Sequence, residues 1–208
     1  DDQLDTMVMF INRGINRHEA KDASMYLSGS QIDTFLLLKE KGFDSVDARM
    51  GAKEFNDSQI DTMITIKNEG FEGKYGYIAA SDLTESEIEM MIRLKRGGIE
   101  DYYSFEGSDL TESEIETMIR LKREGVEDDS LIYRAVIKLT ESQMDNMIRL
   151  LRRVHADFAF KVARNLTDNQ IETFLNLKSQ GFTITQAYRM AKRFSNRQID
   201  AMTRTGNS

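Results

Sequence analysis

LTESEIEMMIRLKRGG over Leu83–Gly98 and LTESEIETMIRLKREG over Leu110–Gly125 are almost the same sequence, 27 residues apart. LTDNQIETFLNLKSQG over Leu166–Gly181 is a third clear copy, and weaker copies begin at Leu27, Phe55, Leu139 and Phe194. One apolar position near the start of each copy recurs at intervals of 27 to 29 residues: Leu4, Ile32, Ile60, Ile88, Ile115, Met144, Ile171 and Ile199. So regular a period indicates a tandem repeat of about 28 residues.

Each copy opens with a signal for the start of a helix. A Ser, Thr or Asn stands three residues before a Glu or Gln, which is the spacing of a capping box, where each side chain bonds the other residue's free backbone N–H. The pairs are Ser28–Gln31, Asn56–Gln59, Thr84–Glu87, Thr111–Glu114, Thr140–Gln143, Thr167–Gln170 and Ser195–Gln198. Apolar residues then follow at helical spacing, so we expect a first helix of about 13 residues in each copy.

The end of this helix is specified as well, because glycine follows the apolar stretch in six copies. These glycines are Gly14, Gly42, Gly70, Gly98, Gly125 and Gly181, and each is followed by Ile, Phe or Val. A left-handed glycine followed by an apolar residue that packs back on the helix is the Schellman stop. The copy beginning at Leu139 has Val154 in place of the glycine and His155 in place of the apolar residue.

About ten residues remain before the next cap, which is enough for a second, shorter helix. Small residues recur there four positions apart, and they let a helix backbone approach its neighbour closely. These pairs are Ala20/Ser24, Ala48/Ala52, Gly76/Ala80, Ala159/Ala163 and Ala187/Ala191. The copies beginning at Leu83 and Leu110 depart from the rule and predict a local change in stacking.

A helix pair of this length cannot bury its apolar face alone, so neighbouring pairs must stack. We expect an all-α fold, a right-handed superhelical α-solenoid of about 7.5 two-helix repeats of about 28 residues. Residues 1–208 form a single array in this interpretation, with units 1–26, 27–54, 55–82, 83–109, 110–138, 139–165, 166–193 and 194–208. Neither end has the polar surface of a terminal cap. We therefore expect a segment of a longer chain, or end-on packing against a partner.

The pattern resembles the class of α-hairpin repeats that includes tetratricopeptide, HEAT and TAL-effector-like arrays. Its period is shorter than theirs, and their signature residues are absent. The resemblance implies a stack of two-helix units that offers an extended binding surface.

Composition excludes several kinds of chemistry. The chain has no Pro, which suits helices that end at glycine. It also has no Cys, so disulfides, thiol nucleophiles and zinc–thiolate sites are ruled out. Its two histidines, His18 and His155, lie in distant repeats, and we expect no catalytic, cofactor-binding or metal-binding residues and no enzyme activity. There is no apolar run of 18 residues and no signal-peptide pattern, so we expect a cytoplasmic chain without a membrane span.

The net charge of −7 is unevenly distributed. Residues 139–208 carry 11 Lys and Arg against six Asp and Glu, whereas residues 1–138 carry 17 against 29. Solvated helix faces explain much of this, because acids favour first turns and bases favour last turns. They do not explain why the two parts differ in sign, which favours different partners for each part.

Two charged columns recur with the repeat. The lysines are Lys39, Lys67, Lys95, Lys122 and Lys178, and the acids are Asp5, Asp33, Asp61, Glu89, Glu116, Asp145, Glu172 and Asp200. We expect an acid of one unit to bridge to a lysine of the next, with a charged binding strip as the alternative. Within single helices, Glu116–Arg120 and Asp145–Arg149 have the spacing of exposed ion pairs.

Three functions fit these features. The first is a scaffold that binds protein partners or packs in a larger assembly, the second is a nucleic-acid-binding solenoid that uses the basic C-terminal repeats, and the third is a non-catalytic segment of a larger effector or enzyme. The first is favoured, because a pI near 5.0 and the lack of a Gly-rich phosphate loop count against nucleic acid. The expected contact residues are the aromatic Tyr102, Tyr103 and Phe105 and the basic Arg149, Arg152 and Arg153.

Overall fold

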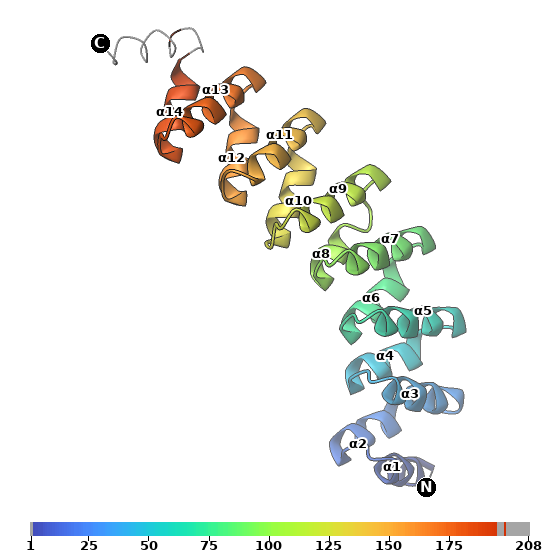
Figure 1. The fold of residues 1–208 in the computed structure, drawn as a ribbon. Helices are drawn as coiled ribbons and strands as arrows, with labels where there is room; N and C mark the ends of the chain where they lie inside the picture. Colours follow the sequence, from blue (N-terminus) through green and yellow to red (C-terminus); the bar gives the residue numbers. More distant parts are fainter. Residues whose placement is uncertain (1, 195–197, 199–208) are drawn as a thin grey trace. The chain divides into compact units, whose positions relative to one another are not determined.

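The computed structural model describes residues 2–194 and residue 198. In this part of the chain the fold is all-helical, as expected, and 14 helices follow one another without a strand (Figure 1). Each odd-numbered helix packs against the even-numbered helix that follows it. The helices are α1 (Asp2–Asn12), α2 (Arg17–Tyr26), α3 (Ser30–Glu40), α4 (Ser45–Glu54), α5 (Asp57–Asn68), α6 (Gly73–Asp82), α7 (Glu85–Arg96), α8 (Asp101–Glu106), α9 (Glu112–Arg123), α10 (Asp129–Lys138), α11 (Glu141–Leu151), α12 (Ala156–Asn165), α13 (Asp168–Ser179) and α14 (Ile184–Arg193).

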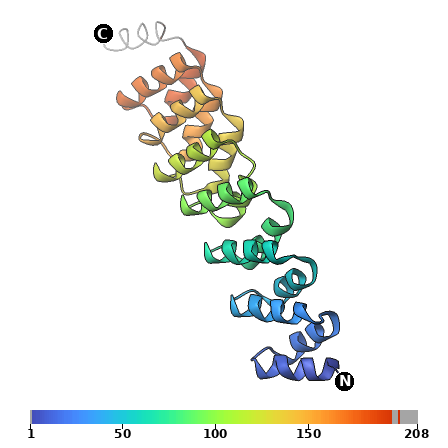
Figure 2. The same cartoon turned by 90° about the vertical axis from the view of Figure 1, so that its right-hand side faces the viewer.

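The helices group into two compact units. Unit 1 is Asp1–Leu110 and contains α1 to α8, and unit 2 is Thr111–Ser208 and contains α9 to α14. In unit 1 the even-numbered helices contact one another in turn, and in unit 2 α10 contacts α12. Within each unit the hairpins follow one another in chain order in both views (Figures 1 and 2). A single array across both units stays a prediction.

The capping boxes explain where most first helices begin. Asn56–Gln59, Thr84–Glu87, Thr111–Glu114, Thr140–Gln143 and Thr167–Gln170 all close boxes. A box not expected from the repeat, Thr183–Gln186, starts the second helix α14. Ser195, of the last expected pair, lies outside the described residues.

The box expected at Ser28 and Gln31 is wrong. Gln31 accepts the Ser28 backbone N–H at 3.2 Å, which is half of the box. The N-cap of α3 is Gly29, with φ of 51°, and no side chain caps the helix. The backbone turns one residue later than the pattern suggests, so the Ser28 hydroxyl cannot serve as the cap.

The glycine stops are confirmed. All six expected glycines have φ between +83° and +91°, in the left-handed region that favours glycine. The following residue bonds back across each turn, as in Phe43 N–H to Leu38 O at 3.1 Å and Val126 N–H to Leu121 O at 3.2 Å. This is the six-to-one bond of the Schellman motif.

The turn after α11 has a different construction. The backbone N–H groups of Arg153 and Val154 both bond Leu150 O, at 2.8 and 3.0 Å, and no glycine stands in this turn. Val154 is buried like Val126, so it takes the place of the apolar residue and the glycine position is deleted. The expected placement of His155 was therefore wrong, because His155 is the exposed N-cap of α12. The deletion accounts for the 27-residue interval between Met144 and Ile171.

The core follows the expected apolar column. Phe35, Met63, Met91, Met118, Met147 and Phe174 are fully buried. Met7 is half-buried, and Met202 lies outside the described residues. The small pairs of the second helices are buried as well, and a Cβ at Gly76 would come within 3.0 Å of the Met63 carbonyl oxygen. Small side chains therefore bring the two helices of a hairpin into close contact.

One face of α1 is apolar and uncovered. Leu4, Val8 and Ile11 share this face and expose 59%, 48% and 37% of their surface. The residues equivalent to Leu4 and Val8 in the other described first helices are buried or half-buried. In the part of the chain that the structure describes, Leu4 and Val8 are therefore less covered than their equivalents.

Candidate functional site

A groove lined by arginines crosses three first helices of unit 2. It has a volume of about 490 Å³ and spans α9, α11 and α13. Arginine is favourable at the C-terminal end of a helix because it faces the negative end of the helix dipole. Because the repeat places these C-terminal positions at equivalent points of successive first helices, their arginine side chains gather on one surface. The groove is lined by Arg120, Ile148, Arg149, Arg152, Arg153, Leu175, Asn176 and Ser179.

Ion pairs between neighbouring first helices border this groove. Arg149 Nη2 donates to Glu172 Oε1 at 2.6 Å, from α11 to α13, and Arg120 Nη1 lies 3.9 Å from Asp145 Oδ1, from α9 to α11. Asn146, which is buried, joins Arg149 to Asp168 through bonds of 3.3 and 2.7 Å. Asp145 and Glu172 of the acid column therefore pair with arginines of the preceding first helix, and the expected pairing with lysines was wrong for these two residues.

Lysines of the recurring lysine column contact residues at the start of the second helix. Lys122 Nζ lies 2.8 Å from Asp129 Oδ1 at the start of α10, and Lys95 pairs with Asp101 at the start of α8. Lys39 donates to Ser45 Oγ at 2.8 Å. These three lysines thus tie the end of a first helix to the start of the second helix in the same hairpin, which is a structural role.

Two expected site residues remain available for binding. Arg152 and Arg153 are both exposed, and neither has an ion-pair partner among the residues that the structure describes. Buried Ile148 and half-buried Leu175 form the apolar part of the lining beside them. Free guanidinium groups next to apolar surface suit an acidic ligand with apolar side chains.

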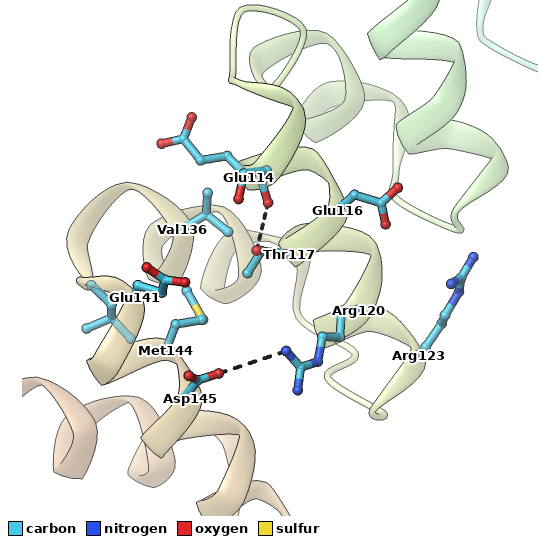
Figure 3. A pocket seen from close by; sticks show the side chains of 11 residues that line it. Glu114, Glu116, Thr117, Arg120, Arg123, Val136, Glu141, Met144 and Asp145 are labelled. Carbon is cyan, nitrogen blue, oxygen red and sulfur yellow. Dashed lines mark hydrogen bonds and ion pairs between the residues drawn. The ribbon is translucent and has the colours of Figure 1, made fainter. Parts of the chain in front are cut away.

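A second groove adjoins the first. It has a volume of about 630 Å³, lies between α9, α10 and α11, and shares Arg120 with the arginine-lined groove. Figure 3 shows Arg120 extending toward Asp145, with Arg123 further along the same helix. The hydroxyl and backbone N–H of Thr111 lower the pKa of Glu114, which lines this groove. That shift comes from helix capping and gives no sign of a catalytic acid or base.

The aromatic residues belong to unit 1. Tyr102 is 51% exposed on the short helix α8 and stacks edge-on against Tyr103, with ring centroids 4.9 Å apart. Phe105 is half-buried, packs against the core cluster of unit 1, and its ring centroid lies 6.3 Å from that of Tyr75. Of the three, Tyr102 presents the most surface to a partner.

The repeat contains a signal that would have identified further groove residues. Arg120, which lines both grooves, stands one repeat before Arg149, and Arg123, which lines only the second groove, stands one repeat before Arg152. Comparing columns instead of single units therefore finds both additional arginines. Ile148 and Leu175 share another column, and their part in the groove depends on the tertiary packing of α11 and α13.

In the described residues, no cluster of His, Cys, Asp and Glu could hold a metal ion, and no helix is long and apolar enough to cross a membrane. His18 Nδ1 lies 3.7 Å from Asp22 in an exposed pair on α2. Comparisons of the chain with protein-family models, with curated proteins and with solved structures find no match.

Proposed function

We propose that the protein is a non-enzymatic helical-repeat scaffold that binds an acidic segment of a protein partner in the arginine-lined groove of unit 2. The single observation that carries this proposal is the pair of uncommitted, exposed guanidinium groups of Arg152 and Arg153 beside an apolar lining. Arginine and apolar side chains are the residues that binding surfaces favour. The proposed architecture is a right-handed superhelical solenoid of about 7.5 repeats.

The composition of the groove favours a protein over a nucleic acid. Asp145 and Glu172 pair with Arg120 and Arg149, so few unpaired cations remain in this groove, whereas binding of a nucleic-acid backbone depends on several phosphate contacts. The lining contains no aromatic side chain on which bases could stack. Binding of nucleic acid through the basic C-terminal repeats is the second candidate, favoured by the 11 Lys and Arg of residues 139–208.

Packing in a larger assembly is a second part of the proposal. Leu4, Val8 and Ile11 form an exposed apolar face with helical spacing on α1. Contiguous exposed apolar surface of this kind is typical of sites of protein association. End-on self-association through α1 is the form of assembly that we propose.

The binding proposal is tested by fluorescence anisotropy with a glutamate-rich peptide and a single-stranded DNA of equal charge, each titrated against salt. We expect the peptide to bind and the Arg152→Glu/Arg153→Glu variant to abolish its binding. The matched control is Arg164→Glu/Arg189→Glu, which makes the same charge change at exposed positions on α12 and α14 and should retain binding. Tight DNA binding with a steep salt dependence, and none to the peptide, would support the nucleic-acid alternative.

A further inference from the structure

The second helices of unit 2 carry a strong excess of basic residues. Together α10, α12 and α14 contain seven Lys and Arg and two Asp, whereas the first helices α9, α11 and α13 contain five Lys and Arg and seven Asp and Glu. All seven basic residues of the second helices are exposed. We call them the basic surface, and they are Arg134, Lys138, Lys161, Arg164, Arg189, Lys192 and Arg193.

Neither the repeat nor the helix dipole accounts for this surface. The equivalent helices of unit 1, α2, α4, α6 and α8, contain five Lys and Arg and seven Asp and Glu. The dipole favours bases in the last turn, but Arg134, Lys161 and Arg189 lie before the last turn of their helices. Because like charges repel one another, gathering them on one surface costs stability and points to a ligand.

The basic surface keeps its charge in the folded protein. None of its seven side chains is in an ion pair with another residue that the structure describes. Of the two acids on these helices, Asp129 is buried and pairs with Lys122, and only Asp157 is exposed. The surface therefore offers several cations to an external anion.

Aromatic rings lie among these cations. The Arg134 guanidinium carbon is 5.8 Å from the ring centroid of Phe160, which joins α10 to α12, and Lys161 Nζ is 5.4 Å from that of Tyr188, which joins α12 to α14. Phe160 and Tyr188 are both half-buried. These contacts connect the three second helices in the order in which they follow one another in Figure 1, so their charges form a continuous surface.

Cations interleaved with aromatic side chains suit a single strand of nucleic acid. The cations contact its phosphates, and the rings stack against its unpaired bases. An anionic membrane surface fits less well, because a helix that lies on a membrane inserts an apolar face. The apolar side chains of these helices face the core, and Ile137 is the only large one that is exposed in their described residues.

We propose that the basic surface of unit 2, together with Phe160 and Tyr188, binds single-stranded nucleic acid. The phosphates contact the Lys and Arg side chains of α10, α12 and α14, and bases stack on the two rings. This inference goes beyond the proposed function, because the arginine-lined groove lies across the first helices and binds its acidic peptide independently. It also gives the nucleic-acid candidate a defined surface and a defined kind of strand.

The test is fluorescence anisotropy with a labelled thymidine oligonucleotide and a uridine RNA of the same length, each titrated against salt. Both should bind, and their affinity should fall steeply as the salt concentration rises. Arg164→Glu/Arg189→Glu should weaken binding at least tenfold and reduce the salt dependence, because it removes phosphate contacts. The matched control is Arg152→Glu/Arg153→Glu, which makes the same charge change on the first-helix side and should retain nucleic-acid binding.

A second variant tests the aromatic contribution. Phe160→Leu removes one ring and keeps an apolar side chain, so it should weaken binding of both single strands about tenfold. Inorganic polyphosphate has the phosphates but no bases, and its binding should be unchanged in Phe160→Leu. Retained polyphosphate binding also shows that the variant is folded.

The results separate this inference from the proposed function. Peptide binding lost in Arg152→Glu/Arg153→Glu, without any nucleic-acid binding, would overturn the inference and leave the proposed function supported. Equal loss of nucleic-acid binding in the two charge-reversal variants would show that total charge is responsible, and would also overturn it. The same holds if Phe160→Leu weakens polyphosphate as much as the oligonucleotides, or if vesicles of phosphatidylserine bind and the oligonucleotides do not.

Discussion

Gly97 and Gly98 are consecutive residues with opposite backbone requirements. Gly97 caps α7 with φ of −73° and ψ of −4°, a conformation that any residue adopts, whereas Gly98 has φ of 90°. The Ile99 N–H then bonds Leu94 O at 3.1 Å and closes the turn. The helix stop thus depends on the second glycine alone.

Gly98→Ala should lower the free energy of unfolding by about 1–2 kcal/mol, because an L side chain is strained at positive φ. The matched control is Gly97→Ala, which should leave stability unchanged or raise it by about 0.4–1 kcal/mol by restricting the unfolded chain. Urea unfolding followed by circular dichroism measures both. Equal losses in the two variants would contradict the assignment of the stop to Gly98.

The capping boxes give a second comparison. Thr111→Ala removes the hydroxyl that accepts the Glu114 backbone N–H at 3.4 Å, and should cost about 0.5–2 kcal/mol. Ser28→Ala should cost much less, because the Ser28 side chain does not cap α3. Thermal unfolding of the two variants measures this difference. An equal loss of stability would show that the Ser28 side chain does cap α3.

The same box has a pH dependence with a defined sign. Bonds from Thr111 lower the pKa of Glu114 below its ordinary value of 4.5, so the ionised carboxylate stabilises the folded state. That contribution is present above pH 4.5 and is lost as the pH falls through the lower folded-state pKa. The cost of Thr111→Ala should accordingly shrink in acid.

Local chemistry made the helix boundaries predictable. Caps such as Thr84 and stops such as Gly125 act within a few residues, so spacing alone identifies them. The turn at Val154 was misplaced, because a one-residue deletion is compatible with two alignments, and only burial shows that Val154 fills the apolar position. The Ser28 cap failed for a similar reason, since its geometry depends on the backbone of Gly29.

The site was harder to predict than the fold. Arg152 and Arg153 are visible in the sequence as a basic pair, but their freedom from ion pairs depends on which acids reach them in three dimensions. Arg149 looked similar in the sequence, and it is held by Glu172 on the next first helix. Arginine–acid pairs between first helices and lysine contacts within a hairpin, such as Lys122–Asp129, cannot be told apart from the charge pattern along the chain, so only the structure separates them.

Asp47 predicts a pH-dependent change in stability. Its Oδ2 atom is buried and has no hydrogen-bond partner among the described residues. Burial and, next, the Asp44 carboxylate raise the pKa of Asp47 above its ordinary value of 3.8, against the opposing effect of Lys67 and Lys74. The ionised form therefore costs stability above the folded-state pKa, and this cost disappears as the pH falls below the ordinary value of 3.8.

Asp47→Asn should consequently stabilise the protein at pH 7, by less than about 1 kcal/mol because solvent screens the partly exposed carboxyl. The gain should vanish below about pH 3, where the wild-type carboxyl is protonated in both states. Urea unfolding at a series of pH values measures this difference. A stability gain that is the same at about pH 3 and at pH 7 would show that the charge of Asp47 is not its cause.

The uncovered face of α1 predicts self-association. Val8 is 48% exposed at the centre of a face that also contains Leu4 and Ile11, so Val8→Glu places a charge in the contact. Sedimentation velocity should show a concentration-dependent increase in mass for the wild type and a monomer for Val8→Glu. Leu37→Glu is the matched control, because Leu37 is a 39% exposed apolar residue on α3, away from this face, and its variant should still associate. A wild-type monomer at all concentrations would contradict end-on association through α1, while an equal loss of association in the Leu37 variant would place the contact elsewhere.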